Sequence, residues 1–100
     1  MDAKTRKRLR QIAHHLDPVL IVGGQGLSDN LVTEANRALS DHELVKVKVQ
    51  SADRAERAEL AEALARHCDA TLVQKIGKII VLFRENPEAK LALSNLSRFG

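Results

Sequence analysis

The sequence predicts a single compact α/β domain built on a four-stranded mixed sheet. Three observations predict this class: apolar residues recur at helical spacing in three segments, strand-like apolar runs lie between those segments, and a glycine-centred hairpin follows the last helix. The expected order is helix, strand, helix, strand, helix, strand, strand. Because helices link the early strands and a hairpin closes the sheet, we expect the helices mainly on one side. A chain of 100 residues holds one such core and not two.

The first half of the chain contains two predicted helices separated by a short strand. Residues 4–16 carry apolar side chains at spacings of three and four, and the residue before Pro18 ends the helix. Residues 19–22 are wholly apolar and mostly β-branched, which is typical of a strand buried on both faces. Ser28 is a suitable N-cap for the next helix, which buries apolar residues as far as Leu39.

A second strand and a third helix are predicted next. Residues 44–50 alternate, with Val45, Val47 and Val49 on one face and Lys46 and Lys48 on the other, which indicates a half-buried strand with the lysines exposed. Asp53, with a glutamate three residues later, predicts the N-terminus of a helix. An apolar stripe at helical spacing then continues to about residue 68.

The last predicted elements are two strands joined by a tight turn. Residues 71–76 and 79–84 are rich in β-branched side chains, and Gly77-Lys78 between them is the signal of a type II′ hairpin. The apolar pattern decays after this hairpin. We therefore expect the domain to cover residues 1–84 and residues 85–100 to form a flexible C-terminal tail.

The charge of the chain is mildly basic and unevenly distributed. The formal net charge is +3 and the sequence pI is about 9.4. Five Lys or Arg residues lie within residues 1–10, whereas acidic residues gather within residues 53–62. This distribution indicates a basic side that suits a polyanionic partner. Only Phe83 and Phe99 are aromatic, so we do not expect a nucleic-acid contact to depend on stacking of bases on surface aromatics.

The cysteine content and the hydropathy pattern bear on the compartment. A single cysteine, Cys68, cannot form an intramolecular disulfide, which favours a reducing environment. No stretch approaches the roughly 18 apolar residues of a membrane span. The N-terminus is charged and no apolar run begins before Val19, which argues against a secretory signal. We therefore expect a cytoplasmic protein with no membrane contact.

Three glycines follow the first predicted strand, as Gly23-Gly24-Gln25-Gly26. A dinucleotide fingerprint fails because Asp29 occupies the third glycine position, and a P-loop fails because no Gly-Lys-Ser/Thr follows. A G-x-x-G clamp, as in KH domains, would bring backbone N–H groups close to phosphates. The alternative is a tight turn in which Gly23 and Gly24 adopt positive φ. These residues alone favour neither the clamp nor the turn.

The histidines and the cysteine do not form a recognisable catalytic or metal motif. No pair among His14, His15, His42, His67 and Cys68 has the spacing of zinc ligands, and adjacent residues in a helix point apart. Paired carboxylates suited to acid–base catalysis are not evident either. We therefore expect no metal site, no cofactor, no small-molecule substrate and no enzymatic activity.

Three stretches of the chain, in register, resemble one known family. They are LRQIAHHLDPVLIVGGQGLSDNLV, HELVKVKV and VQKIGKIIVLFR, and they cover roughly residues 9–84. The resemblance is to the CRM domain family (chloroplast RNA splicing and ribosome maturation), and within it to the single-domain bacterial YhbY-type proteins. It implies a fold similar to the C-terminal domain of translation initiation factor three. It also implies RNA binding and association with the precursor of the large ribosomal subunit, hence a role in ribosome assembly.

By position, Gly23, Gly24, Gln25 and Gly26 take the place of the family's RNA-facing loop. The central pair of the loop lacks a basic residue, so contact there would come from backbone amides and the Gln25 side chain. The basic residues of the first helix, the second strand and the hairpin would extend the surface. The full set of candidate RNA-binding residues is Gly23, Gly24, Gln25, Gly26, Lys7, Arg10, Lys46, Lys48, Lys75, Lys78 and Arg84.

The expected partner is ribosomal RNA of the large-subunit precursor, bound by a monomer. The rival hypothesis is a protein-interaction module, which would dock on a ribosomal protein or an assembly factor without touching RNA. In that case the basic charge would serve solubility.

Overall fold

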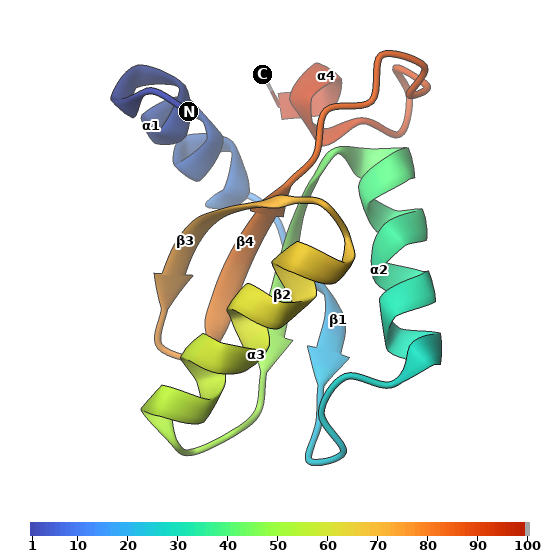
Figure 1. The fold of residues 1–100 in the computed structure, drawn as a ribbon. Coiled ribbons are helices and arrows are strands. Elements are labelled where there is room, and N and C mark those ends of the chain that lie inside the picture. Colours follow the sequence, from blue (N-terminus) through green and yellow to red (C-terminus); the bar gives the residue numbers. More distant parts are fainter. Residues whose placement is uncertain (100) are drawn as a thin grey trace.

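The computed structural model describes residues 1–99 and has the predicted order of elements, with one short helix added at the C-terminal end (Figure 1). The four strands form one sheet in the order β1-β2-β4-β3, in which β1 and β2 are parallel and the other pairs are antiparallel. The predicted mixed sheet is therefore confirmed. The elements are α1 (Ala3–Ala13), β1 (Pro18–Val22), α2 (Asp29–His42), β2 (Leu44–Val49), α3 (Arg54–His67), β3 (Thr71–Ile76), β4 (Ile79–Phe83) and α4 (Asn95–Phe99).

The helices begin where the sequence supplies an N-cap. The Ser28 hydroxyl accepts a hydrogen bond from the Leu31 amide at 3.1 Å, and the Asp53 carboxylate accepts one from the Ala55 amide at 2.9 Å. Both predicted caps are confirmed. Such side-chain acceptors satisfy amides that have no partner within the first turn of a helix.

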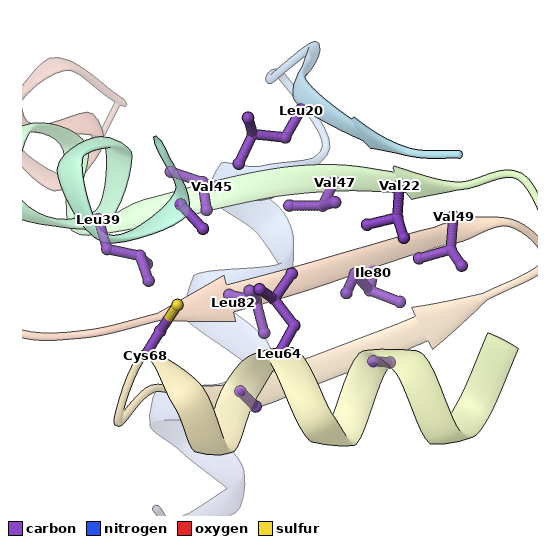
Figure 2. Packing of buried hydrophobic residues seen from close by; sticks show 13 residues of the cluster. Leu20, Val22, Leu39, Val45, Val47, Val49, Leu64, Cys68, Ile80 and Leu82 are labelled. Atoms are coloured by element: carbon purple, nitrogen blue, oxygen red, sulfur yellow. The ribbon is translucent and has the colours of Figure 1, made fainter. Parts of the chain in front are cut away.

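The two longer helices cover one face of the sheet. α2 and α3, each of 14 residues, pack over a large apolar cluster with strand side chains such as Val47 and Leu82 (Figure 2). α1 packs on the opposite face, where Leu9 and Ile12 join a smaller cluster with Val81. The expectation of helices mainly on one side thus describes only α2 and α3, because α1 lies on the other face and Leu96 of α4 packs against the same cluster there. The periodicity of α1 predicts an apolar stripe and does not specify which face of the sheet it covers.

The second strand divides its side chains between these two faces. Val45, Val47 and Val49 are buried in the cluster beneath α2 and α3. Lys46 and Lys48 therefore point to the side of the sheet on which α1 packs, as the pleat of a strand requires. They are half-buried there, because α1 covers only part of that side. We call this side of the molecule the α1 face.

The first strand corrects one expectation. Residues 19–22 were expected to be buried on both faces, but Val19 is 48% exposed and Ile21 is 55% exposed. β1 is an edge strand, and these two side chains alternate with Leu20 and Val22 of the large cluster. They consequently lie on the α1 face, at a part of the sheet that α1 leaves uncovered.

The segment after β4 also differs from the expected flexible tail. The Glu43 carboxylate accepts hydrogen bonds of 2.8 Å from the Ser94 hydroxyl and from the Asn86 amide, and the Asn95 side-chain amide donates to the Leu44 carbonyl at 2.7 Å. Ser94 and Asn95 are buried. Buried polar groups with satisfied partners fix the tail at specific positions. Apolar periodicity does not report such contacts, which is why the sequence failed to predict them.

Candidate nucleic-acid interface

The loop of residues 23–26 joins the end of β1 to the start of α2 at one end of the sheet (Figure 1). The Gly26 amide donates to the Gly23 carbonyl at 3.1 Å and closes a turn. Gly26 has φ of 71°, in the left-handed region that favours glycine. The need for a tight turn therefore explains Gly26.

The turn does not explain the other two glycines. Gly23 and Gly24 are absent from the residues with positive φ, and a Cβ added at either position would meet no heavy atom within 4 Å. Both residues and Gln25 are exposed. The alternative in which Gly23 and Gly24 adopt positive φ is thus wrong. The fold has room for side chains at these two positions. Because glycine has no side chain, the backbone of the loop stays accessible to a ligand.

The β3–β4 hairpin lies at the same end of the sheet as the glycine loop. The Val49 amide donates to the Lys78 carbonyl at 2.7 Å, and the Gln50 amide donates to the Val22 carbonyl at 2.9 Å. Gly77 has φ of 56°, as the predicted type II′ turn requires at its first central position. Lys78 therefore lies at the same end of the sheet as the glycine loop, and we call this end the rim of the α1 face.

The α1 face brings Arg10 and Lys46 together from distant parts of the chain. Both line a hollow of about 260 Å³ between α1 and the uncovered part of the sheet, with His14, Ile76 and Ile79 among its other walls. Ile76 is 61% exposed. Lys7 is exposed on the same helix. The face thus combines cationic side chains with aliphatic surface.

Two of the predicted cations lie elsewhere. Lys75 is paired in the sheet with Ile80, whose side chain belongs to the cluster under α2 and α3. Directly opposite side chains share a face of the sheet, so Lys75 is not on the α1 face. Its Nζ is 3.9 Å from a carboxylate oxygen of Glu62 on α3.

Arg84 is the clearest correction among the candidates. Its guanidinium donates to the side chain and the carbonyl of Asn36 at 2.7 and 2.8 Å, to the Cys68 carbonyl at 2.7 Å and to the Ser40 hydroxyl at 3.0 Å. These bonds tie α2 to the end of α3. Because the guanidinium makes these hydrogen bonds within the protein, Arg84 stabilises the fold and is not available as a contact for RNA.

The charges of the helices differ between the two faces. α1 contains five Lys or Arg residues and no acidic residue. α2 contains three acidic residues and one arginine, and α3 contains three of each sign. One cation of α1 is engaged within the fold, since Arg6 donates to the carbonyls of Leu72 and Val73 at 3.1 and 2.6 Å. The positive potential therefore concentrates on the α1 face.

The structure also shows how the potential metal ligands and the single cysteine are placed. Within the part of the chain that it describes, no three His, Cys, Asp or Glu side chains lie close enough together to hold a metal ion. Cys68 is buried, and this burial raises the pKa of its thiol while the Arg84 guanidinium opposes the rise. A buried thiol with a raised pKa is a poor nucleophile. Among residues 1–99 no helix has the length and apolar character needed to span a bilayer.

Sequence reasoning missed the contribution of the tail to the α1 face. α4 contacts α1 and β2, and it places Arg98 and Phe99 beside His15 and Lys46 at a second hollow. A five-residue helix is too short to show an apolar periodicity in the sequence. The exposed Val19 and Ile21 were missed for a different reason: an apolar run does not reveal whether its strand lies at an edge.

Comparison with known proteins identifies the family to which this chain is similar. The CRS1 / YhbY (CRM) domain matches residues 1–84. The chain is 46% identical over 95 residues to a Pseudomonas aeruginosa protein named “Probable RNA-binding protein”, covering 95% of this chain and 91% of that protein. It is 43% identical over 93 residues to a Haemophilus influenzae protein named “RNA-binding protein”, covering 93% and 94% of the two chains.

A solved structure agrees with the observed fold. The solution structure of a Staphylococcus aureus protein, described as a candidate RNA-binding protein, superposes with a TM-score of 0.78 at 36% sequence identity, over 90% of this chain and 94% of that one. Both the sequence match and the fold therefore lead to the same conclusion. The chain belongs to the CRS1/YhbY (CRM) domain family.

Proposed function

We propose that the protein binds RNA through the α1 face, with the glycine loop and Lys78 at its rim. The observation that carries this proposal is the segregation of charge: the helix of this face has five cations and no acidic residue, and Lys46 and Lys48 emerge beside it from β2. A helix whose charged side chains are all positive, beside two further lysines, attracts a polyanion such as RNA. The names of the relatives point the same way.

The cations of this face would neutralise phosphates. Lys46 and Lys48 are half-buried, so their aliphatic stems lie along neighbouring side chains while their ammonium groups reach the surface. This limits the freedom that each lysine loses on binding. With about four to six phosphate contacts, the logarithm of the affinity should fall against the logarithm of salt concentration with a slope of roughly −3 to −5.

The glycine loop would supply close approach rather than charge. Gly23 and Gly24 are exposed, and the fold does not require glycine at either position. Glycine at these positions would instead allow a bulky ligand to approach the backbone closely. Backbone N–H groups at such a loop, followed by the N-terminus of α2, favour an anionic oxygen. The Gln25 side chain adds one amide that both donates and accepts.

We further propose, from the family resemblance, that the RNA is ribosomal RNA of the large-subunit precursor and that the protein assists assembly as a cytoplasmic monomer. The rival role, docking on a ribosomal or assembly protein, draws support from the exposed Val19, Ile21 and Ile76. These apolar side chains surround lysines, however, and the mixture suits a nucleic acid at least as well.

Reversal of charge at Lys46 and Lys48 should weaken RNA binding strongly. The double variant Lys46→Glu with Lys48→Glu removes two phosphate partners, so affinity should fall by more than tenfold at moderate salt and the salt slope should become shallower by about 1 to 2. Fluorescence anisotropy titrations at several salt concentrations measure both quantities.

The matched control is Arg37→Glu with Arg66→Glu, which changes the net charge equally on exposed positions of α2 and α3. It should alter the affinity by less than threefold. An equal loss in the two double variants would mean that net charge alone drives binding, and it would refute the proposed face.

Substitution at Gly24 should weaken binding without unfolding the domain. The site has open space for a Cβ, so Gly24→Asn and Gly24→Asp should both melt within a few degrees of the parent. Asn should lower RNA affinity severalfold by blocking close approach, and Asp should lower it further by repelling phosphate. Unchanged affinity of both variants in a gel-shift titration would show that the loop is only a turn.

Association with ribosome precursors can be tested in cell extract. In a sucrose gradient the protein should co-migrate with large-subunit precursors, and nuclease treatment should release it to the top fractions. Retention on a purified ribosomal protein after nuclease treatment would instead favour the protein-docking role.

A further inference from the structure

A second hollow opens on the α1 face, at the end of the sheet opposite the glycine loop. Its volume is about 330 Å³, within the range of ligand pockets. Its walls come from the chain between α1 and β1, from the start of β2 and from α4, and they include Lys46, which also borders the hollow beside Arg10. The two hollows are therefore neighbours on one surface.

We propose that this second hollow holds an unpaired RNA base. The inference rests on the proposed function and specifies the kind of RNA that the α1 face accepts. It also gives a role to residues 85–99, which lie beyond the region matched by the family. Those residues form one wall of the hollow through Asn95, Arg98 and Phe99.

The hollow has a planar aromatic wall. The rings of Phe99 and His15 are stacked with centroids 6.1 Å apart and an interplanar angle of 8°. Phe99 is 42% exposed, and Arg98 lies with its guanidinium carbon 5.2 Å from the ring centroid. The chain has no Trp or Tyr, and Phe83 is half-buried against α1. Of the two phenylalanines, Phe99 is thus the one that the α1 face offers to a base for stacking.

The polar groups of the hollow suit the edge of a base better than a phosphate. Lys46 and Arg98 donate hydrogen bonds, whereas the Asp17 carboxylate accepts them and repels an anion. His42 contributes one more acceptor in its neutral form, because its Nδ1 donates to the Leu93 carbonyl at 2.7 Å and leaves Nε2 free to accept. A base edge carries donors and acceptors side by side, and a phosphate carries acceptors alone.

The wall that carries Phe99 is held in place from the core. Ser94, which directly precedes α4, is buried and donates to the Glu43 carboxylate. The Arg98 amide donates to the Ser94 carbonyl at 3.0 Å and so continues the helix from that anchor. A stacking surface positioned before the ligand arrives loses less entropy on binding.

The test compares single-stranded and duplex RNA on the full chain. The probes are a labelled 12-nucleotide RNA of mixed sequence and a duplex of the same sequence. Phe99→Ala should lower affinity for the single strand about tenfold, since it removes one base–aromatic stack, and it should change duplex affinity less than twofold. Phe99→Tyr should restore the affinity for the single strand.

The matched control is Leu91→Ala in the same tail, at an apolar side chain that is 78% exposed and outside the hollow. It should leave both affinities unchanged. If Phe99→Ala leaves single-strand affinity intact, or lowers single-strand and duplex affinity equally, the base pocket is refuted while RNA binding by the parent stands. If the parent binds neither RNA, the proposed function itself fails.

A third arm separates a base within a strand from a free nucleotide. Guanosine and adenosine monophosphates should bind the parent far more weakly than the 12-nucleotide strand, because the remaining phosphate contacts lie along the α1 face. Mononucleotide binding as tight as that of the strand would overturn the assignment to an RNA base and would identify the hollow as a nucleotide site.

Discussion

The alternation of valine and lysine along β2 determines which face of the sheet is apolar and which is cationic. This strand pairs with β1 on one side and β4 on the other, and its three valines are buried beneath α2 and α3. Because side chains alternate across a sheet, burial of the valines places Lys46 and Lys48 on the opposite face. A slip of one residue in the register would bury both lysines in the core, at a prohibitive cost. The position of the cationic strand is thus fixed by packing, and the proposed RNA surface follows from the core.

The helix α1 covers only part of the face on which it packs. α1 has a single stripe of apolar residues, which packs over Leu44, Val73 and Val81 near one side of the sheet. The remaining surface carries lysines between exposed Val19 and Ile21. At the two ends of β1 lie the glycine loop and the hollow walled by α4, separated by about 17 Å for a five-residue strand. An RNA that reaches both would follow the length of the sheet across its cationic centre.

Local signals in the sequence predicted the elements well, because their causes are local. The caps at Ser28 and Asp53 and the glycine of the hairpin act within a few residues, and each is found where the sequence placed it. Contacts between distant segments were not predictable in this way. The bonds of Arg84 to Asn36 and Cys68, and those of Glu43 to the tail, join residues far apart in sequence. A cation free to bind RNA and a cation that ties two helices look the same in the sequence.

The candidate site was likewise predicted where its signals are local and missed where it depends on contacts between distant segments. The glycine loop was identified from its place between a strand and a helix, and the lysines of β2 from their alternation. The structure adds which glycines the fold itself needs, since only Gly26 of the loop has positive φ. It also shows that Lys75, which was expected to extend the basic surface, lies on the other face from the lysines of β2. The exposed Phe99 could not be assigned to this surface before the docking of α4 was known.

RNA bound to the α1 face can be distinguished from RNA bound across α2 and α3 by paramagnetic relaxation enhancement. The ¹⁵N-labelled protein is bound to an RNA that carries a nitroxide spin label. If RNA lies on the α1 face, amide signals of α1, the glycine loop and α4 should broaden most, and those in the middle of α2 and α3 should broaden least. The strongest broadening in the middle of α2 and α3 would contradict binding to the α1 face.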